Sequence, residues 1–147
     1  MNPYVVIDIG GTSIKYGLAD AKGQLLETHE MPTEAQKGGP HILNTTKEIV
    51  ARYLKKHPLA GVAISSAGMV DPDKGEIFYA GPQIPNYAGT QFKKEIEETF
   101  QIPCEIENDV NCAGLAEVTT GHAKGSNNAV CLTIGTGIGG CLLLDGQ

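Results

Sequence analysis

Two glycine-rich segments, one near each end of the 147-residue chain, contain the residue types that bind phosphate groups. The first, Gly10-Gly11-Thr12, follows an apolar run that contains Asp8 and precedes Lys15. Glycine backbone N–H groups can approach an anion closely, and a threonine hydroxyl adds a donor. Lys15 can neutralise phosphate charge, and Asp8 can hold Mg²⁺ through water. Gly-Gly-Thr also occurs in ordinary tight turns, but a carboxylate in an apolar strand is costly unless it is paired or used.

The second segment lies between two apolar runs, and its phosphate-binding candidates are Gly135, Thr136, Gly137 and Gly139. Gly135, Gly137 and Gly140 also match the spacing of a dinucleotide-binding fingerprint, which must open a helix. A short apolar run and a turn follow instead, so we expect a second strand–turn–strand hairpin and no dinucleotide site.

Asn108 and Asp109 lie where a predicted strand passes into a predicted helix. Open α/β sheets bind ligands at the carboxyl ends of their strands. An aspartate at such a position can accept a proton from a hydroxyl group and hold that group in line with a phosphoryl group. The same pair also fits the N-cap of a helix, because Asp and Asn are preferred capping residues.

The elements around these residues follow an α/β pattern. Three antiparallel strands are expected up to residue 31, and strands and helices then alternate. The later expected elements are a helix over 41–56, strands over 61–68 and 76–80, a helix from an N-cap at Thr90 to about Phe100, a strand over 102–107 and a helix over 109–120. This order predicts a domain with a mixed sheet over residues 1–120. A linker and the first hairpin of a second lobe are expected over 121–147.

Composition excludes several classes of partner. The formal net charge is −6 without a basic run, which argues against nucleic acid or an anionic membrane. No apolar stretch is long enough to span a bilayer and no signal peptide is evident, so we expect a cytoplasmic protein. The cysteines have no metal-site spacing and are expected to be free thiols in the core; they are Cys104, Cys112, Cys131 and Cys141.

The phosphate segments resemble those of a known superfamily. Residues 8–15, Asp-Ile-Gly-Gly-Thr-Ser-Ile-Lys, resemble the first phosphate motif of the actin and hexokinase superfamily, and residues 132–140 resemble its second. Glu107-Asn108-Asp109-Val110-Asn111-Cys112-Ala113 is similar to the catalytic segment of the ROK family of bacterial sugar kinases. The resemblance extends through essentially the whole chain and is closest to glucokinases and β-glucoside kinases. It implies a ribonuclease H-like, actin-like ATPase lobe at the N-terminus.

The resemblance also implies an activity and a site. A phosphoryl group would pass from Mg·ATP to a primary hydroxyl, the 6-hydroxyl, of a hexose or a β-glucoside. Asp109 would be the catalytic base and Asn108 a sugar ligand, while the two glycine tips, Lys15 and Asp8 would hold ATP and Mg²⁺. The other residues expected to border the sugar are Gly68, Gly81, Asn86 and Tyr87. The family more often has Asn and Trp at the positions of Gln83 and Tyr87, although Tyr87 can still offer an apolar ring face to a sugar.

Other features of the family do not occur in these residues. The zinc motif, further sugar-binding acids and most of the adenosine pocket lie beyond the second phosphate segment. We therefore expect an N-terminal fragment that is inactive alone, with structural Zn²⁺ only in a C-terminal lobe and a homodimer or larger assembly for the longer protein. The alternatives are a ROK-type sugar-responsive transcriptional regulator without its DNA-binding domain and a non-catalytic sugar-binding lobe. A regulator would place a helix-turn-helix ahead of the first phosphate motif, and the first strand already begins at Tyr4.

Overall fold

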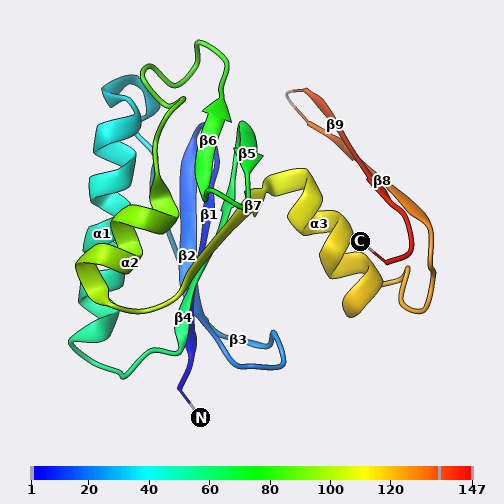
Figure 1. Ribbon diagram of the computed structural model, residues 1–147, viewed down its shortest axis with the longest axis horizontal. Helices are drawn as coiled ribbons and strands as arrows, with labels where there is room; N and C mark the ends of the chain where they lie inside the picture. Colours follow the sequence, from blue (N-terminus) through cyan, green and yellow to red (C-terminus); the bar gives the residue numbers. More distant parts are fainter. Residues whose placement is uncertain (1, 136, 147) are drawn as a thin grey trace. The chain divides into compact units, whose positions relative to one another are not determined.

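The computed structural model of the protein describes residues 2–135 and 137–146 (Figure 1). Its contacts divide the chain after Glu107 into two compact units. We call residues 1–107 the N-terminal unit and residues 108–147 the C-terminal unit, and each is described on its own. The lobe boundary expected in the linker that begins at residue 121 stays a prediction.

A five-stranded sheet forms the centre of the N-terminal unit, with strand order β3-β2-β1-β4-β7. Its strands are β1 (Tyr4–Ile9), β2 (Ser13–Ala19), β3 (Leu25–Pro32), β4 (Gly61–Ser66) and β7 (Cys104–Asn108). β2 pairs with β1 and with β3 in antiparallel fashion, whereas β1 and β4 are parallel. The mixed sheet predicted from the sequence is therefore confirmed.

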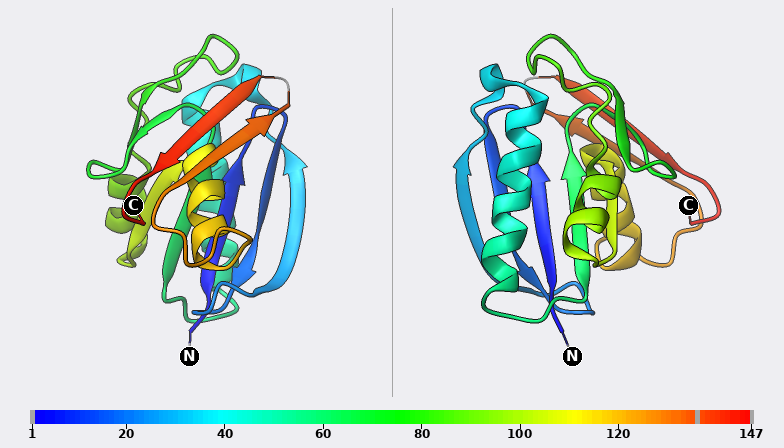
Figure 2. Two further views of the ribbon diagram at one scale, coloured as in Figure 1. Left: turned by 90° about the vertical axis from the view of Figure 1, so that its right-hand side faces the viewer. Right: turned by 60° about the vertical axis from the view of Figure 1, so that its left-hand side comes forward.

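Helices α1 (Gly39–Leu54) and α2 (Phe92–Phe100) cover one face of this sheet, as Figure 2 shows. A proline occupies the first turn of α1, where its missing N–H costs nothing. Lys47 of α1 and Glu95 of α2 form an ion pair of 2.8 Å that joins the two helices. Within the described ranges, no helix is long and apolar enough to cross a membrane.

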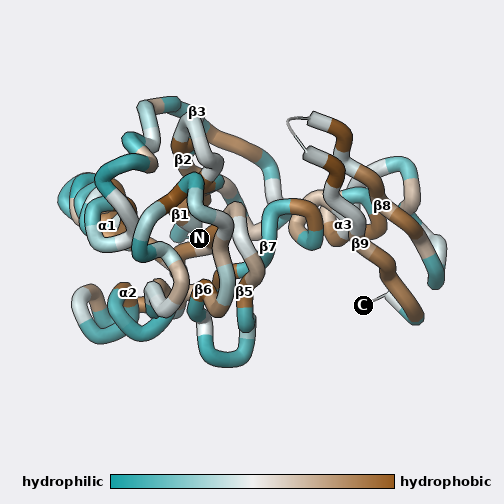
Figure 3. The backbone as a smooth tube through the Cα atoms, turned by 90° about the horizontal axis from the view of Figure 1, so that it is seen from above, coloured by the Kyte–Doolittle hydropathy of each residue, from teal (hydrophilic) through white to brown (hydrophobic). Residues whose placement is uncertain are grey.

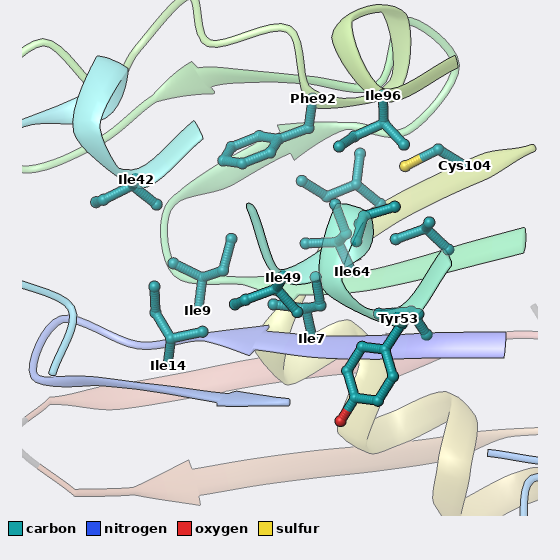
Figure 4. Packing of buried hydrophobic residues seen from close by; sticks show 14 of the residues in the cluster. Ile7, Ile9, Ile14, Ile42, Ile49, Tyr53, Ile64, Phe92, Ile96 and Cys104 are labelled. Carbon is teal, nitrogen blue, oxygen red and sulfur yellow. The ribbon is translucent and has the colours of Figure 1, made fainter. Parts of the chain in front are cut away.

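The core lies between the sheet and these helices, and strand alternation decides which side chains enter it (Figure 4). Val5, Ile7 and Ile9 of β1 are at most 2% exposed, whereas Val6 is half-buried and Asp8 is exposed. Successive residues of a strand point to opposite faces, and fully burying an aliphatic side chain contributes roughly 1.5–3 kcal/mol. The apolar residues therefore fix the register of β1, and that register places Asp8 on the face opposite the helices.

The segment between β4 and α2 contains a small hairpin that the sequence predicted only in part. β6 (Glu76–Tyr79) was expected, but it pairs with a short strand, β5 (Met69–Asp71), that was not. A short 3₁₀ helix, η1 (Ala35–Lys37), also precedes α1. The expected N-cap at Thr90 is wrong: Gln91 occupies the cap position, and the Thr90 hydroxyl donates instead to the backbone oxygen of Tyr87 at 2.6 Å.

The C-terminal unit consists of α3 (Asp109–Thr119) packed on the hairpin of β8 (Ala129–Ile134) and β9 (Ile138–Leu143). A Cβ atom on Gly114 of α3 would lie 2.7 Å from the Cys141 sulfur and 2.9 Å from a Leu143 methyl. The helix therefore needs glycine at this contact. Of the four cysteines, Cys104 alone is fully buried, and the other three are half-buried rather than in the core.

The hairpin leaves much apolar surface uncovered. Figure 3 shows hydrophobic residues along both β8 and β9. The exposed apolar side chains, each at least 56% exposed, are Val130, Leu132, Ile134, Ile138, Leu142 and Leu144. Alternate residues of the two strands, such as Leu143 at 2% exposure, face inward instead.

Candidate active site

The face of the N-terminal sheet opposite α1 and α2 carries a row of polar side chains across three neighbouring strands. Asp8 of β1 lies opposite Lys15 of β2 and next to Ser65 of β4 in the strand register. The Ser65 hydroxyl donates a hydrogen bond of 2.7 Å to Asp8 Oδ1. Asp8 and Lys15 are both exposed, and Lys15 takes part in no ion pair among the described residues. The sequence analysis identified Asp8 and Lys15 but missed Ser65, whose only signal was its place in a run of small residues.

The glycine tip at residues 10–12 lies directly beyond this row. The Gly10 N–H closes the turn by donating to the Ser13 oxygen at 3.0 Å. Thr33, fully buried, holds the turn from the side: its hydroxyl donates to the Gly10 oxygen at 2.7 Å and its N–H to the Thr12 oxygen at 2.9 Å. Gly11 has open space around it and donates no backbone hydrogen bond within the described part of the chain. The turn is thus rigid at its base and accessible at its apex.

These residues fit a magnesium-bound nucleotide. Mg²⁺ prefers oxygen ligands, keeps several waters, and is often held by one or two carboxylates together with substrate phosphates. Asp8 supplies one exposed carboxylate, and the described residues contain no group of three or more His, Cys, Asp or Glu side chains that could enclose a metal. Such a site suits an ion that arrives with its phosphates rather than a resident metal.

The second glycine tip joins β8 and β9 in the C-terminal unit, as a hairpin rather than the start of a helix. The Gly135 N–H donates to the Gly137 oxygen at 2.9 Å, and nothing lies within 4 Å of the position where either would carry a Cβ. Thr136, the other candidate at this tip, lies outside the described residues. Gly139 differs, because a Cβ there would overlap the Val110 side chain of α3. Its phosphate-binding role stays a prediction, and the structure adds a packing reason for glycine.

Of the two interpretations that the sequence left open for this pair, the structure shows the helix cap, at Asn108, and the catalytic role of Asp109 stays a prediction. Asn108 has extended backbone angles and is the N-cap of α3: its Oδ1 accepts from the backbone N–H groups of Val110 at 3.0 Å and Asn111 at 3.2 Å. Asp109 is the first residue of the helix and is exposed, with Oδ1 accepting from the Val110 N–H at 2.8 Å. The cap therefore depends on Asn108 and leaves the Asp109 carboxylate accessible at a helix N-terminus, where negative charge is favoured.

The predicted sugar-bordering residues lie in two segments of the N-terminal unit. Gly68 follows β4 with φ of +92°, and a Cβ there would lie 3.0 Å from the Tyr79 backbone oxygen, so both conformation and space favour glycine. A Cβ on Gly81 would overlap the Gln83 side chain. Asn86 is exposed with φ of +53° and lines a shallow depression of about 300 Å³ beside Pro40 of α1.

Tyr87 does not have the predicted position. It is 1% exposed, its ring packs edge-on against Phe92 with centroids 6.0 Å apart, and its hydroxyl lies 2.6 Å from Ser66 Oγ. Burial raises the pKa of the Tyr87 hydroxyl, so it stays protonated and can donate. The predicted contact between this ring and a sugar is therefore wrong for this structure, because the loop turns the ring into the core.

The candidate residues thus form two groups. The N-terminal unit brings together Asp8, Lys15, Ser65 and the first glycine tip, and it also contains the segments around Gly68 and Gly81. The C-terminal unit contains Asn108, Asp109 and the second glycine tip. The distances and hydrogen bonds given above lie within one group or the other.

Comparison with known proteins finds sugar kinases among the relatives of this chain. The sequence pattern of the ROK family matches residues 4–147. An uncharacterized protein of Clostridium perfringens is 52% identical over 147 residues, 100% of this chain and 50% of that protein. A β-glucoside kinase of Klebsiella pneumoniae is 38% identical over 141 residues, 95% of this chain and 46% of that enzyme. A ROK family glucokinase from Streptomyces griseus, solved with glucose and AMPPNP, superposes with a TM-score of 0.84 at 30% identity, over 99% of this chain and 45% of the other. The chain spans about half the length of the curated relatives it matches.

Proposed function

The chain belongs to the ROK family, and from this we propose that it supplies the N-terminal part of an ATP-dependent sugar kinase. The observation that carries the proposal is the exposed Asp109 carboxylate at the first position of α3, held there by a turn that Asn108 caps. A cap alone would not need an acid beside it, since the side-chain amide oxygen of Asn108 already accepts from two of the first backbone N–H groups of the helix.

Asp109 is the proposed catalytic base. Its carboxylate accepts the proton of the attacking sugar hydroxyl, and a positioned base of this kind contributes about 10²- to 10⁴-fold in rate. Asn108 fixes the backbone that presents Asp109 and is the proposed ligand of neighbouring sugar hydroxyls. The proton transfer leaves the sugar oxygen able to attack a phosphoryl group held in line with it.

The two glycine tips are the proposed phosphate cradle. Bound Mg·ATP supplies the phosphoryl group that is transferred and the cation that neutralises its charge. The N–H of Gly11 and the hydroxyl of Thr12 donate to phosphate oxygens, and Lys15 balances their charge. Asp8, oriented by Ser65, holds the metal through its water ligands. Preorganised donors of this kind do not have to reorient during the reaction.

The proposed acceptor is a primary hydroxyl, the 6-hydroxyl, of a hexose or a β-glucoside. The relatives support this class, because their names specify glucokinase and β-glucoside kinase activities. Gly68, Gly81 and Asn86 are the proposed residues that border the sugar. We also propose that the longer protein forms a homodimer or larger assembly, and that the 147 residues alone do not turn over.

The test is sugar-dependent ADP release by the longer protein with Mg·ATP, across hexoses, amino sugars and β-glucosides. Asp109→Asn should lower turnover by about 10²- to 10⁴-fold while leaving sugar binding measurable by calorimetry. Asp145→Asn is the matched control, because Asp145 is another exposed aspartate of the same unit and should keep full activity.

Two results would contradict the proposal. Undiminished turnover in Asp109→Asn would show that Asp109 is not the catalytic base. Sugar binding without turnover by the unaltered protein would instead favour the sugar-responsive regulator or the non-catalytic lobe.

A further inference from the structure

Two consecutive hydrogen bonds lead from the Tyr87 hydroxyl through Ser66 to the end of β4. The Tyr87 hydroxyl lies 2.6 Å from Ser66 Oγ, and Ser66 Oγ–H donates to the Ala67 backbone oxygen at 2.9 Å. A serine hydroxyl has one hydrogen to donate. Because Ser66 uses it toward Ala67, the Tyr87 hydroxyl is the donor to Ser66. Tyr87 and Ser66 are 1% and 0% exposed, so water does not replace either bond.

These two hydrogen bonds join the two segments that border the proposed sugar site. Ala67 directly precedes Gly68, and Tyr87 lies within the loop of residues 81–90. Backbone bonds also hold this loop: Gly39 N–H donates to the Pro85 oxygen at 2.9 Å, Gly89 N–H to the Ile77 oxygen at 2.6 Å, and Ile77 N–H to the Thr90 oxygen at 3.0 Å. The link through Ser66 adds a side-chain connection from this loop to the residues after β4.

We propose that Tyr87 and Ser66 are positioning residues for the sugar acceptor, which fix the 81–90 loop against the Ala67–Gly68 turn without touching the sugar. The inference rests on the proposed function, because it takes these two segments as the border of the sugar site. Small displacements of substrate-positioning groups cost much rate and affinity. Loss of the link therefore weakens sugar binding and leaves nucleotide binding at the glycine tips unchanged.

Tyr53 provides a matched control for this proposal. It is another core tyrosine, 4% exposed, whose hydroxyl interacts with the Glu27 carboxylate. Tyr53 belongs to α1 and Glu27 to β3, away from both sugar segments in the chain. Tyr53→Phe and Tyr87→Phe each remove one hydroxyl from a buried ring and keep the ring. Any difference between them in sugar binding reports on the position of the hydroxyl rather than on the loss of a tyrosine hydroxyl in general.

The experiment compares the longer protein with Tyr87→Phe, Ser66→Ala, the double variant and Tyr53→Phe. Tyr87→Phe should raise the Kd of the sugar, measured by calorimetry, by roughly 2- to 10-fold, which corresponds to about 0.4–1.4 kcal/mol. The Kd of AMPPNP should stay unchanged. Tyr53→Phe should leave both constants unchanged. An unchanged sugar Kd in Tyr87→Phe, or an equal rise in Tyr53→Phe, would overturn the proposal.

Hydrogen–deuterium exchange provides a readout that does not depend on sugar or turnover. Tyr87→Phe should speed exchange in residues 67–70 as well as in 81–90, and leave residues 10–12 as they are. Unchanged exchange in residues 67–70 would overturn the link even if the protein is a sugar kinase. If instead the unaltered protein neither binds nor phosphorylates any sugar, the proposed function fails, whatever the exchange experiment shows.

Discussion

At the residue scale, the two adjacent serines at the end of β4 serve opposite faces of the sheet. Ser65 donates to Asp8 on the face opposite α1 and α2, and Ser66 accepts from Tyr87 inside the core. Neither serine has an unusual neighbour in the sequence. Their roles follow from strand alternation, which points consecutive side chains to opposite sides.

The buried pair of Ser66 and Tyr87 leads to an asymmetric stability prediction. Ser66→Ala leaves the Tyr87 hydroxyl buried without its acceptor and should lower the free energy of unfolding by about 1–3 kcal/mol. Tyr87→Phe removes the donor and leaves Ser66 bonded to Ala67, so it should cost only about 0.5–1.5 kcal/mol. Urea denaturation of the 147-residue chain gives both values.

The double variant is the control for this prediction. Ser66→Ala combined with Tyr87→Phe should cost less than the sum of the single changes, because no buried hydroxyl is then left unpaired. Strict additivity, or a larger cost for Tyr87→Phe than for Ser66→Ala, would contradict the assigned donor and acceptor.

The sequence identified candidate residues by type, but it did not predict the exposure of each one. Asp8, Lys15 and Asp109 were identifiable because a charged residue beside an apolar run or at a helix start requires an explanation. Tyr87 was not, because its burial depends on Ser66 and Phe92, and a loop aromatic carries no periodic signal of its own. Thr33 and Ser65 were missed for the same reason, since each partner is distant in the sequence.

At the element scale, two neighbouring glycines of β9 test how α3 packs on its hairpin. Gly139→Ala would place a Cβ against Val110 of α3 and should destabilise the C-terminal unit by about 1–3 kcal/mol. Gly140→Ala is the matched control, because a Cβ there would lie 3.5 Å from Leu132, an ordinary contact. Hydrogen exchange across α3, β8 and β9 measures the effect. Equal effects of the two substitutions would contradict the described packing.

The ion pair between α1 and α2 leads to a prediction about pH. The hydrogen bond from Lys47, together with its positive charge, lowers the pKa of Glu95 below its ordinary value of 4.5. A lowered folded-state pKa stabilises the fold above the unfolded value, and this stabilisation disappears as the pH falls through the folded value. Glu95→Gln should therefore flatten the decline in the free energy of unfolding below pH 4.5. The change should be modest, because the Glu95 side chain is 41% exposed.

Glu98 of the same helix provides the comparison. It is exposed and forms no ion pair within the part of the chain that the structure describes. Glu98→Gln should leave the pH dependence of unfolding as it is. Denaturant titrations between about pH 3 and pH 7 separate the two variants, and an equal flattening in both would show that the α1–α2 pair contributes nothing.

The elements were predictable where apolar periodicity set them, and their ends were less so. α1 and α3 occur close to their expected bounds, because α1 has a regular apolar pattern and α3 has a strong start signal. The predicted cap at Thr90 failed because its hydroxyl bonds backward to Tyr87. β5 was missed because three residues are too few for an alternating pattern to show.

At the scale of the whole molecule, the uncovered hairpin face dominates the expected solution behaviour. Large exposed apolar patches promote association. Ile134 and Ile138 are register partners with 83% and 81% exposure. The double variant Ile134→Glu/Ile138→Lys should raise the monomeric fraction of the 147-residue chain in sedimentation velocity, with the opposite charges paired across the strands.

The comparison for this prediction lies in the other unit. Leu25 and Leu26 are each 58% exposed and belong to β3. Leu25→Glu/Leu26→Lys should alter association less than the hairpin variant does. An equal effect would show that exposure in general, rather than the hairpin face, drives self-association.

The end of β4 also constrains how this family member can change over evolutionary time. Ser65 and Ser66 satisfy Asp8 and Tyr87 only because they are consecutive on one strand. Inserting or deleting one residue in β4 would exchange the faces of the two serines and break both links at once. Point substitutions, by contrast, break only one link each. We therefore expect descendants of this sequence to keep the length from Gly61 to Ser66 fixed, even where the individual residues differ.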